Sequence, residues 1–245
     1  MKAVILAAGI ASRLRPLTNN IPKCLLKVGD KSILEHTLEN LIANNISDVI
    51  IVTGYLENLV RSFVKEKFAQ LNVTFIFNES YASTNNIYSL WLAKDALLGD
   101  DMLLMDSDII FDKQIIAELI HSGYDNCLAL KRHDVGAEEI KVKADVKGKI
   151  LEISKEVIPS EAAGESIGME LFEKRSVAEL FKIIDHKISV EDKVNIFYEA
   201  AFQELINNKR DIFTVDITKY YSMEIDTAAD LENAVGIMNN HILRK

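Results

Sequence analysis

The chain has 245 residues, 49% of them hydrophobic, which is enough for one large α/β domain or two small ones with a buried core. Its formal charge at pH 7 is −9, yet residues 1–31 contain six basic residues and a single acid. This asymmetry argues against a general nucleic-acid surface and for a local anion site. No apolar stretch approaches the ~20 residues of a membrane span. Cys24 and Cys127 form no metal or disulfide pattern, so we expect a protein of the reducing cytoplasm.

Short apolar runs alternate with helical patterns through the first 131 residues. The runs predict strands at 3–7, 49–53, 73–78, 102–105 and 127–130, and the helical spacing predicts helices over 32–44, 56–68, 87–97 and 115–121. Because each strand is a continuous apolar run, it is typical of a parallel sheet covered on both faces. The predicted fold is therefore α/β, a Rossmann-like, doubly wound, mostly parallel sheet, and ligands of such sheets bind beyond the carboxyl ends of the strands.

The pattern changes after residue 131 to shorter and more polar runs. Strands are predicted at 141–145, 149–154 and 165–172, and helices over 176–186 and 195–207. Since no linker rich in proline or glycine precedes them, we interpret them as a small substrate-binding extension of the same sheet. The chain then returns with strands at 212–216 and 222–225 and a closing helix from about Thr227, where Thr227 and Asp230 fit a capping box.

The turn after the first strand combines small residues with basic ones. Ala7, Ala8 and Gly9 let backbone N–H groups approach an anion closely, and Arg13 and Lys23 supply positive charge. This combination indicates a site for phosphate groups, although it matches neither G-x-x-x-x-G-K-[ST] nor G-x-G-x-x-G. The alternative is an ordinary strand and turn with a solvated basic face.

The same stretch resembles the signature L-A-A-G-x-G-[ST]-R-L-x-P-L-T-x-x-x-P-K of the nucleotidyltransferases, the pyrophosphorylase family. It matches at Leu6, Ala7, Ala8, Gly9, Ser12, Arg13, Leu14, Pro16, Leu17, Thr18, Pro22 and Lys23. The resemblance implies that residues 6–9, Arg13 and Lys23 bind a nucleoside triphosphate. It also implies catalytic roles for Arg13, on the leaving phosphates, and for Lys23, beside the transferred phosphorus. Ala11 replaces the usual glycine, and a positive φ there would cost about 1 kcal/mol.

Two pairs of carboxylates follow predicted strands at a spacing of two residues: Asp106 with Asp108, and Glu224 with Asp226. Carboxylates facing a phosphate loop would repel a nucleotide unless a cation lay between them, and Mg²⁺ is commonly held by one or two carboxylates plus substrate phosphates. The second pair resembles the E-I-D-T motif of the family, which implies Asp226 as a Mg²⁺ ligand, and Asp108 is placed like the family's aspartate after the central strand, which implies the same role. Asp106 is expected as a supporting or alternate ligand within the nucleotide site. The alternatives are a turn cap and a solvated carboxylate for the first pair, and a helix N-cap for Asp226.

The choice of nucleotide depends on a short motif that begins at Asn85. The segment Asn85–Leu90 resembles the N-N-x-Y-S-L motif of the phosphocholine cytidylyltransferase branch, whereas the sugar-activating branch commonly carries a G-T-A type motif there. The resemblance implies CTP as the nucleotide, with Asn85 and Ser89 beside it. The alternative is that the asparagines cap the following helix.

The acceptor site is expected in the extension. Lys155 lies in a segment that resembles I-x-E-K-P, which implies a contact with the acceptor phosphate, and Glu165 resembles an acceptor-contacting glutamate of the family. A cationic head group needs carboxylates and aromatic faces, and Asp192 and Tyr198, together with the residues next to Tyr198, offer both. The alternatives are surface charges at Lys155 and Glu165, and an amphipathic helix start around Tyr198.

Three functions fit these patterns. The first is transfer of CMP from CTP to phosphocholine, phosphoethanolamine or 2-aminoethylphosphonate, with release of pyrophosphate. The second is a sugar-1-phosphate nucleotidylyltransferase, which would carry the G-T-A motif that this chain lacks. The third is an inactive nucleotide-sensing domain, which usually loses Lys23 or the aspartates that are present here.

The family resemblance also divides the chain, as one domain over 1–245, into a nucleotide-binding core (1–131), a substrate-binding part (132–211) and a return strand with a closing helix (212–245). The sequence specifies neither the exact acceptor nor the oligomeric state.

Overall fold

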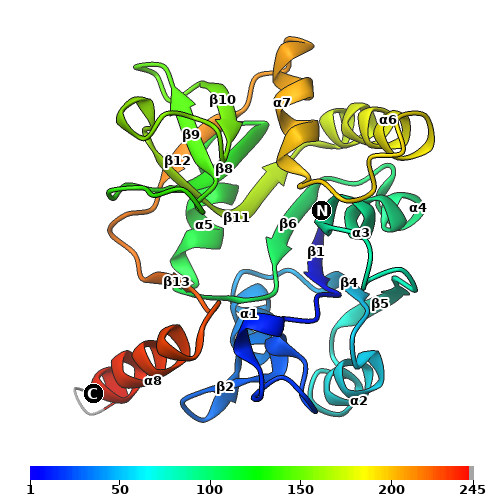
Figure 1. The fold of residues 1–245 in the computed structure, drawn as a ribbon, viewed down its shortest axis with the longest axis vertical. Helices are drawn as coiled ribbons and strands as arrows, with labels where there is room; N and C mark the ends of the chain where they lie inside the picture. The colour runs from blue at the N-terminus through cyan, green and yellow to red at the C-terminus, as the bar shows by residue number, and fades with distance from the viewer. Residues whose placement is uncertain (243–245) are drawn as a thin grey trace.

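A nine-stranded sheet runs through the centre of the computed structural model, which describes residues 1–242 (Figure 1). Four neighbouring strands are parallel, in the order β5 (Asn72–Phe77), β4 (Asp48–Thr53), β1 (Lys2–Ala7) and β6 (Met102–Asp106). Leu6 is level with Val52 on one side and with Asp106 on the other, so the carboxyl ends of these strands meet at one edge. The four predicted strands are confirmed to within one residue at each end.

The expected extension is continuous with this sheet. Strand β11 (Gly164–Phe172) is antiparallel to β6, to β8 (Asn126–Lys131) and to β9 (Lys141–Ala144); β10 (Ile150–Ser154) is antiparallel to β9, and β12 (Phe213–Asp216) is parallel to β8. The register between β11 and β8 shifts between Ser166 and Glu170. Gly168 lies inside this shift with a φ of 70°, and a Cβ there would stand 2.6 Å from Oδ2 of Asp106. The irregularity therefore brings β11 close to the end of β6.

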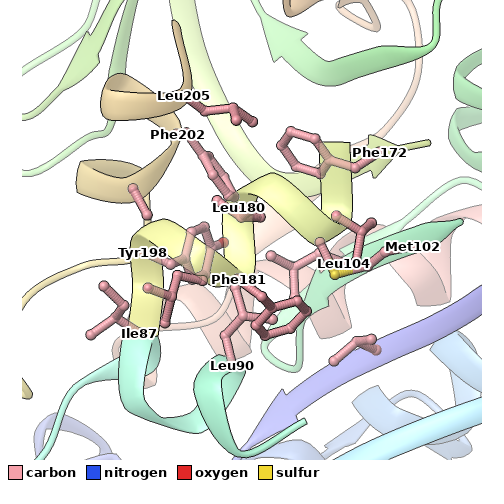
Figure 2. Packing of buried hydrophobic residues seen from close by; sticks show 14 of the residues in the cluster. Ile87, Leu90, Met102, Leu104, Phe172, Leu180, Phe181, Tyr198, Phe202 and Leu205 are labelled. Carbon is pink, nitrogen blue, oxygen red and sulfur yellow. The ribbon is translucent and has the colours of Figure 1, made fainter. Parts of the chain in front are cut away.

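Helices cover both faces of the sheet, as a doubly wound fold requires. Alternate residues of β1 point to opposite faces, so Ala3 and Ile5 join one apolar core while Val4 and Leu6 join the other. The first core is covered by α1 (Ile33–Ala43), α2 (Glu57–Lys67) and α5 (Gln114–Ile120). The second is covered by α3 (Asn86–Leu92), α4 (Lys94–Leu97), α6 (Lys174–Ser189) and α7 (Glu199–Asn207), and Figure 2 shows its side chains packed between helices and strands.

Two predicted helices differ from the observed ones. The helix predicted over 87–97 is divided into α3 and α4 at Ala93, and the helix predicted over 195–207 begins only at Glu199. The later start has a tertiary cause, because the backbone N–H of Tyr198 donates to Oδ1 of Asn86 (2.9 Å) and the N–H of Asn85 donates to the carbonyl of Val194 (3.0 Å). These bonds hold the segment before α7 against the start of α3.

The tail of the chain returns to the carboxyl edge of the sheet. Strand β13 (Ser222–Glu224) is antiparallel to β7 (Ile109–Phe111), and the N–H of Ile225 donates to the carbonyl of Asp108 (2.9 Å). The predicted capping box is confirmed at the start of α8 (Ala228–Ile242): the N–H of Thr227 donates to Oδ2 of Asp230 (2.7 Å), and the N–H of Asp230 donates to Oγ1 of Thr227 (3.2 Å).

The remaining elements are short. They are the hairpin of β2 (Lys27–Val28) and β3 (Lys31–Ser32), and the 3₁₀ turns η1 (Ser12–Leu14), η2 (Lys23–Leu25) and η3 (Pro159–Glu161). Residues 243–245 of the predicted closing segment lie outside the described residues. Within the described part of the chain, every helix is too short or too polar to span a membrane.

Candidate active site

A cleft with two connected halves lies at the carboxyl edge of the parallel strands. The half that we call the loop half has a volume of about 370 Å³ and is lined by the turn after β1, the start of α3 and the end of β6. The half that we call the extension half has about 350 Å³ and is lined by residues of β11 and by Lys155, which directly follows β10. The two halves share Arg13, Asp106, Asp108, Phe197 and Asp226 among their walls.

The backbone conformation of the turn after β1 leaves space beside it. Ala11 has a φ of 52° and a ψ of 52°, the left-handed conformation for which glycine is favoured, so the alanine costs about 1 kcal/mol. Its carbonyl accepts a hydrogen bond from Oγ1 of Thr18 (3.0 Å). A Cβ at position 9 would have no described atom within 4 Å, so the backbone of Gly9 faces open space. This turn leaves room for a ligand beside the residues predicted to bind the nucleotide, Leu6, Ala7, Ala8 and Gly9, all of which line the loop half.

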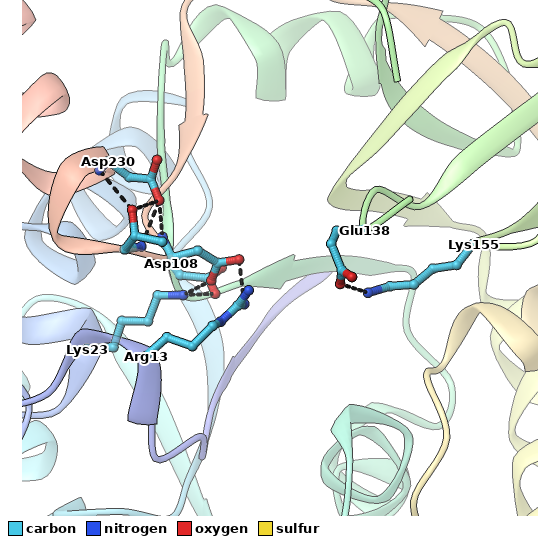
Figure 3. A network of polar contacts seen from close by, with 8 residues as sticks. Arg13, Lys23, Asp108, Glu138, Lys155 and Asp230 are labelled. Carbon is cyan, nitrogen blue, oxygen red and sulfur yellow. Dashed lines mark hydrogen bonds and ion pairs between the residues drawn. The ribbon is translucent and has the colours of Figure 1, made fainter. Parts of the chain in front are cut away.

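Lys23 lines the loop half and lies between the two predicted metal ligands, which line both halves and mark their junction (Figure 3). Its Nζ donates to Oδ2 of Asp108 (2.7 Å) and to Oδ1 of Asp226 (2.6 Å), and Nη2 of Arg13 donates to Oδ2 of Asp226 (2.6 Å). Burial disfavours the ammonium form of Lys23, but the two carboxylates outweigh it and raise its pKa above the usual value. Burial likewise acts to raise the pKa of Asp226, but Lys23 and Arg13 outweigh it and hold that pKa below its usual range.

Three carboxylates converge at this junction. One oxygen each of Asp108, Glu224 and Asp226 lies within 4.8 Å of the others, and Oδ1 of Asp108 is buried with no hydrogen-bond partner among the described residues. Burial of part of the Glu224 side chain, followed by the charges of Asp108 and Asp226, raises its pKa to about 8. The rest of the residue is exposed to solvent. The unpaired oxygen and the all-oxygen donor set fit a hard divalent cation. The sequence pattern contained Glu224 but did not assign it to the metal site.

Asp106 is packed beneath the junction. Its Oδ2 accepts a hydrogen bond from the hydroxyl of Tyr198 (3.0 Å). Position 168 needs glycine, because a Cβ there would lie 2.6 Å from the same Oδ2 of Asp106. Burial, followed by the charges of Asp108 and Glu199, raises the pKa of Asp106 well above its usual value.

The prediction that Tyr198 and Asp192 face the acceptor is not matched by their positions. Tyr198 is 0% exposed and packs in the core against Phe202, with only its hydroxyl directed at Asp106 (Figure 2). Asp192 is exposed and lines neither half of the cleft. Phe197, one residue earlier, lines both halves and is 41% exposed. Adjacent residues before a helix point in different directions, and only the bonds that fix this segment determine which ring reaches the cleft.

Asn85, Asn86 and Ser89 of the N-N-I-Y-S-L segment line the loop half, and Asn85 also caps a helix. The capping alternative therefore holds for Asn85, and the contact with a nucleotide stays a prediction. Oδ1 of Asn85 accepts from the N–H of Asn86 (2.8 Å) at the start of α3. Oγ of the buried Ser89 accepts from Nδ2 of Asn78 (3.1 Å). Asn78, Asn85 and Ser89 all line the loop half.

The other two residues predicted for the acceptor line the extension half. Nζ of Lys155 pairs with Oε2 of Glu138 (3.2 Å) and lies 4.9 Å from the ring centre of Phe197. Oε2 of Glu165 lies 2.7 Å from Nε2 of His133. Glu138 and Phe197 complete this wall. Phe197 is one of the residues next to Tyr198 that the sequence offered for a cationic head group, whereas no sequence motif singled out Glu138.

Comparison with known proteins identifies the class. Residues 2–134, more than half of the chain, match the family model described as nucleotidyl transferase, so the chain belongs to the nucleotidyl transferase family. This finding confirms the family that the first motif indicated.

Particular relatives are similar over nearly the full length. Choline-phosphate cytidylyltransferase of Streptococcus pneumoniae is 30% identical over 240 residues, covering 98% of this chain and 99% of the relative. CTP:phosphoglutamine cytidylyltransferase of Campylobacter jejuni is 26% identical and covers 95% of this chain and 98% of its own. A solved structure of CTP:phosphocholine cytidylyltransferase from Streptococcus pneumoniae has a TM-score of 0.78 and 27% identity, covering 97% of this chain and 98% of that one.

Proposed function

We propose that the protein transfers CMP from CTP to a phosphorylated small amine and releases pyrophosphate. The observation that carries this proposal is the two-part cleft. The predicted nucleotide residues line one half, Lys155 and Glu165 line the other, and Lys23 of the first half contacts Asp108 and Asp226, which line both. The names of the full-length relatives support CTP as the donor and an amine-bearing acceptor.

The reaction needs no covalent intermediate on the protein. An oxygen of the acceptor phosphate attacks the α-phosphorus of CTP, a new P–O bond forms, and the bond from the α-phosphorus to the bridging oxygen breaks to release pyrophosphate. Such transfers depend on positioning and charge stabilisation. In this proposal Lys23 stabilises the charge that develops at the α-phosphate, and Arg13, which lines both halves and has a side chain that is 64% exposed, holds the leaving phosphates.

We propose Mg²⁺ as the cofactor of this site. Asp108 and Asp226, with Glu224 beside them, would hold it, and the unpaired Oδ1 of Asp108 is the observation in favour. When bound, Mg²⁺ supplies charge neutralisation between the carboxylates and the triphosphate.

The acceptor's amine is proposed to lie in the extension half. Glu138, Glu139 and Glu165 line it with Phe197, and an aromatic face beside carboxylates suits an ammonium group. Lys155 is placed to meet the acceptor phosphate. In this scheme residues 1–131 form the nucleotide-binding core, 132–211 the acceptor part and 212–245 the return that brings Asp226 back to the core.

The test is a pyrophosphate-release screen of CTP, UTP, ATP and dTTP against phosphocholine, phosphoethanolamine, 2-aminoethylphosphonate and several hexose 1-phosphates, with MgCl₂ present. We expect CTP with an amine-bearing acceptor to give the highest kcat/KM. If UTP or dTTP with a hexose 1-phosphate is the best pair, the proposed function is wrong and a sugar nucleotidylyltransferase replaces it.

A further inference from the structure

A third cavity, of about 790 Å³, lies between β10 and the start of α7, outside the two halves of the cleft. We call it the distal groove. Its apolar walls are Ile140, Leu151, Ile153, Ile196, Phe197 and Ala200. A hydrogen bond joins the two elements on either side of it, because Oε1 of Gln203 in α7 accepts from the N–H of Ile153 in β10 (2.9 Å).

The distal groove is continuous with the extension half. Ile140, Lys155, Phe197 and Glu199 line both of them. Glu199 is only 5% exposed, and in the part of the chain that the structure describes its buried Oε2 has no hydrogen-bond partner. An unpaired buried carboxylate oxygen is costly, and a ligand that supplies a donor or a positive charge at this junction would compensate it.

The charge of the distal groove limits what it can bind. Glu152, Glu156 and Glu199 line it, and Lys155 at its mouth is the one basic residue among the described lining side chains. An anionic group would therefore be repelled beyond the mouth, whereas a neutral or cationic chain would not.

We propose that the distal groove binds the part of the acceptor that lies beyond its amine nitrogen. The preferred acceptor is then a phosphorylated amine whose nitrogen carries an extended alkyl or cationic substituent, larger than phosphocholine. The inference rests on the proposed function, since it places the acceptor phosphate near Lys155 and its amine near Phe197 and Glu199.

The experiment compares acceptors that differ only beyond the nitrogen. Pyrophosphate release with CTP is measured for phosphocholine and for analogues in which one methyl group is replaced by n-butyl, n-hexyl or 5-carboxypentyl. We expect kcat/KM to rise by about two- to fourfold for each of the first methylene groups, since full burial of one is worth ~0.8 kcal/mol. The carboxypentyl analogue should lose this gain.

Two variants test whether the distal groove is responsible. Ala200→Leu narrows the groove at an exposed helical position and should abolish the gain of the n-hexyl analogue while phosphocholine retains its kcat/KM. Ala43→Leu makes the same change at an exposed position of α1, on the opposite face of the sheet, and should leave the gain intact. Leu151→Asn, on the partly exposed β10, provides a second test if the first variant does not fold.

The outcomes separate this inference from the proposed function. The role of the distal groove would be refuted if the longer analogues react no better than phosphocholine. It would also be refuted if Ala200→Leu lowers kcat/KM equally for phosphocholine and for the n-hexyl analogue. Either result leaves the cytidylyltransferase proposal standing. Turnover with hexose 1-phosphates and with none of the amines would overturn both.

Discussion

Replacement of Lys23 by methionine removes the charge at the junction and keeps an unbranched side chain. Nζ of Lys23 lies 2.7 Å from Asp108 and 2.6 Å from Asp226, in a position where it can meet charge developing at the α-phosphate. Loss of a preorganised electrostatic contact of this kind costs roughly 3–4 kcal/mol in the transition state, so kcat should fall by about 10²–10³.

The same variant should also be less stable. A hydrogen bond to a charged group is worth about 1.5–3 kcal/mol. The side chains of Asp108 and Asp226 are 22% and 27% exposed, so solvent screens part of this energy. We expect the free energy of unfolding to drop by roughly 1–3 kcal/mol, which lowers Tm by about 2–8 °C in a protein of this size.

Steady-state pyrophosphate release and thermal unfolding of the same preparation provide both measurements. Lys27→Met serves as the control, because Lys27 is an exposed lysine of β2 outside the cleft. The Lys23→Met variant should also show a larger rise in Tm with MgCl₂ than the wild type, since Lys23 no longer competes for the same two carboxylates. Near-normal turnover in a folded Lys23→Met variant would refute the role of Lys23, whatever its Tm.

Three further outcomes are expected. Asp226→Asn should lower kcat and remove the rise in Tm with MgCl₂; an unchanged rise would exclude this residue as a ligand. Phe197→Ala should raise KM for the amine acceptor by roughly two- to thirtyfold, whereas Tyr198→Phe should leave it unchanged and cost about 1 kcal/mol of stability; the reverse pattern would contradict the positions of the two rings. Burial raises the pKa of Glu199 from 4.5 to about 7, so the folded state binds more protons than the unfolded one between these values. The free energy of unfolding should therefore decrease as the pH rises from about 4.5 to about 7. Glu199→Gln should reduce this decrease, which is measured by comparing unfolding at pH 5 and at pH 8.

The sequence by itself determined the features that depend on neighbouring residues. Apolar runs predicted the four parallel strands to within one residue. For β1, β4 and β6 the reason is burial on both faces, which needs apolar side chains at nearly every position, whereas β5 at the edge of the sheet is only partly buried. The turn with Arg13 and Lys23 was identified for a similar reason, since its small and basic residues stand together in the chain. The capping box at Thr227 is likewise local, because its two partners are three positions apart.

Only the tertiary structure decided how distant segments meet. Lys23 and Asp226 are 203 positions apart, and the pairing of β13 with β7 brings Asp226 to Lys23. Burial is the main cause of the raised pKa of Glu224, and the charge of Asp108, which that same pairing brings near, raises it further.

The acceptor side shows the same limit at the level of a single residue. Periodicity alone allowed Tyr198 to face the ligand, but the bond from its N–H to Asn86 fixes the segment before α7, so that Tyr198 enters the core and Phe197 lines the cleft. Local patterns determine which residues are available. Long-range hydrogen bonds and strand pairing determine which of them face one another, because those contacts depend on where the rest of the chain lies.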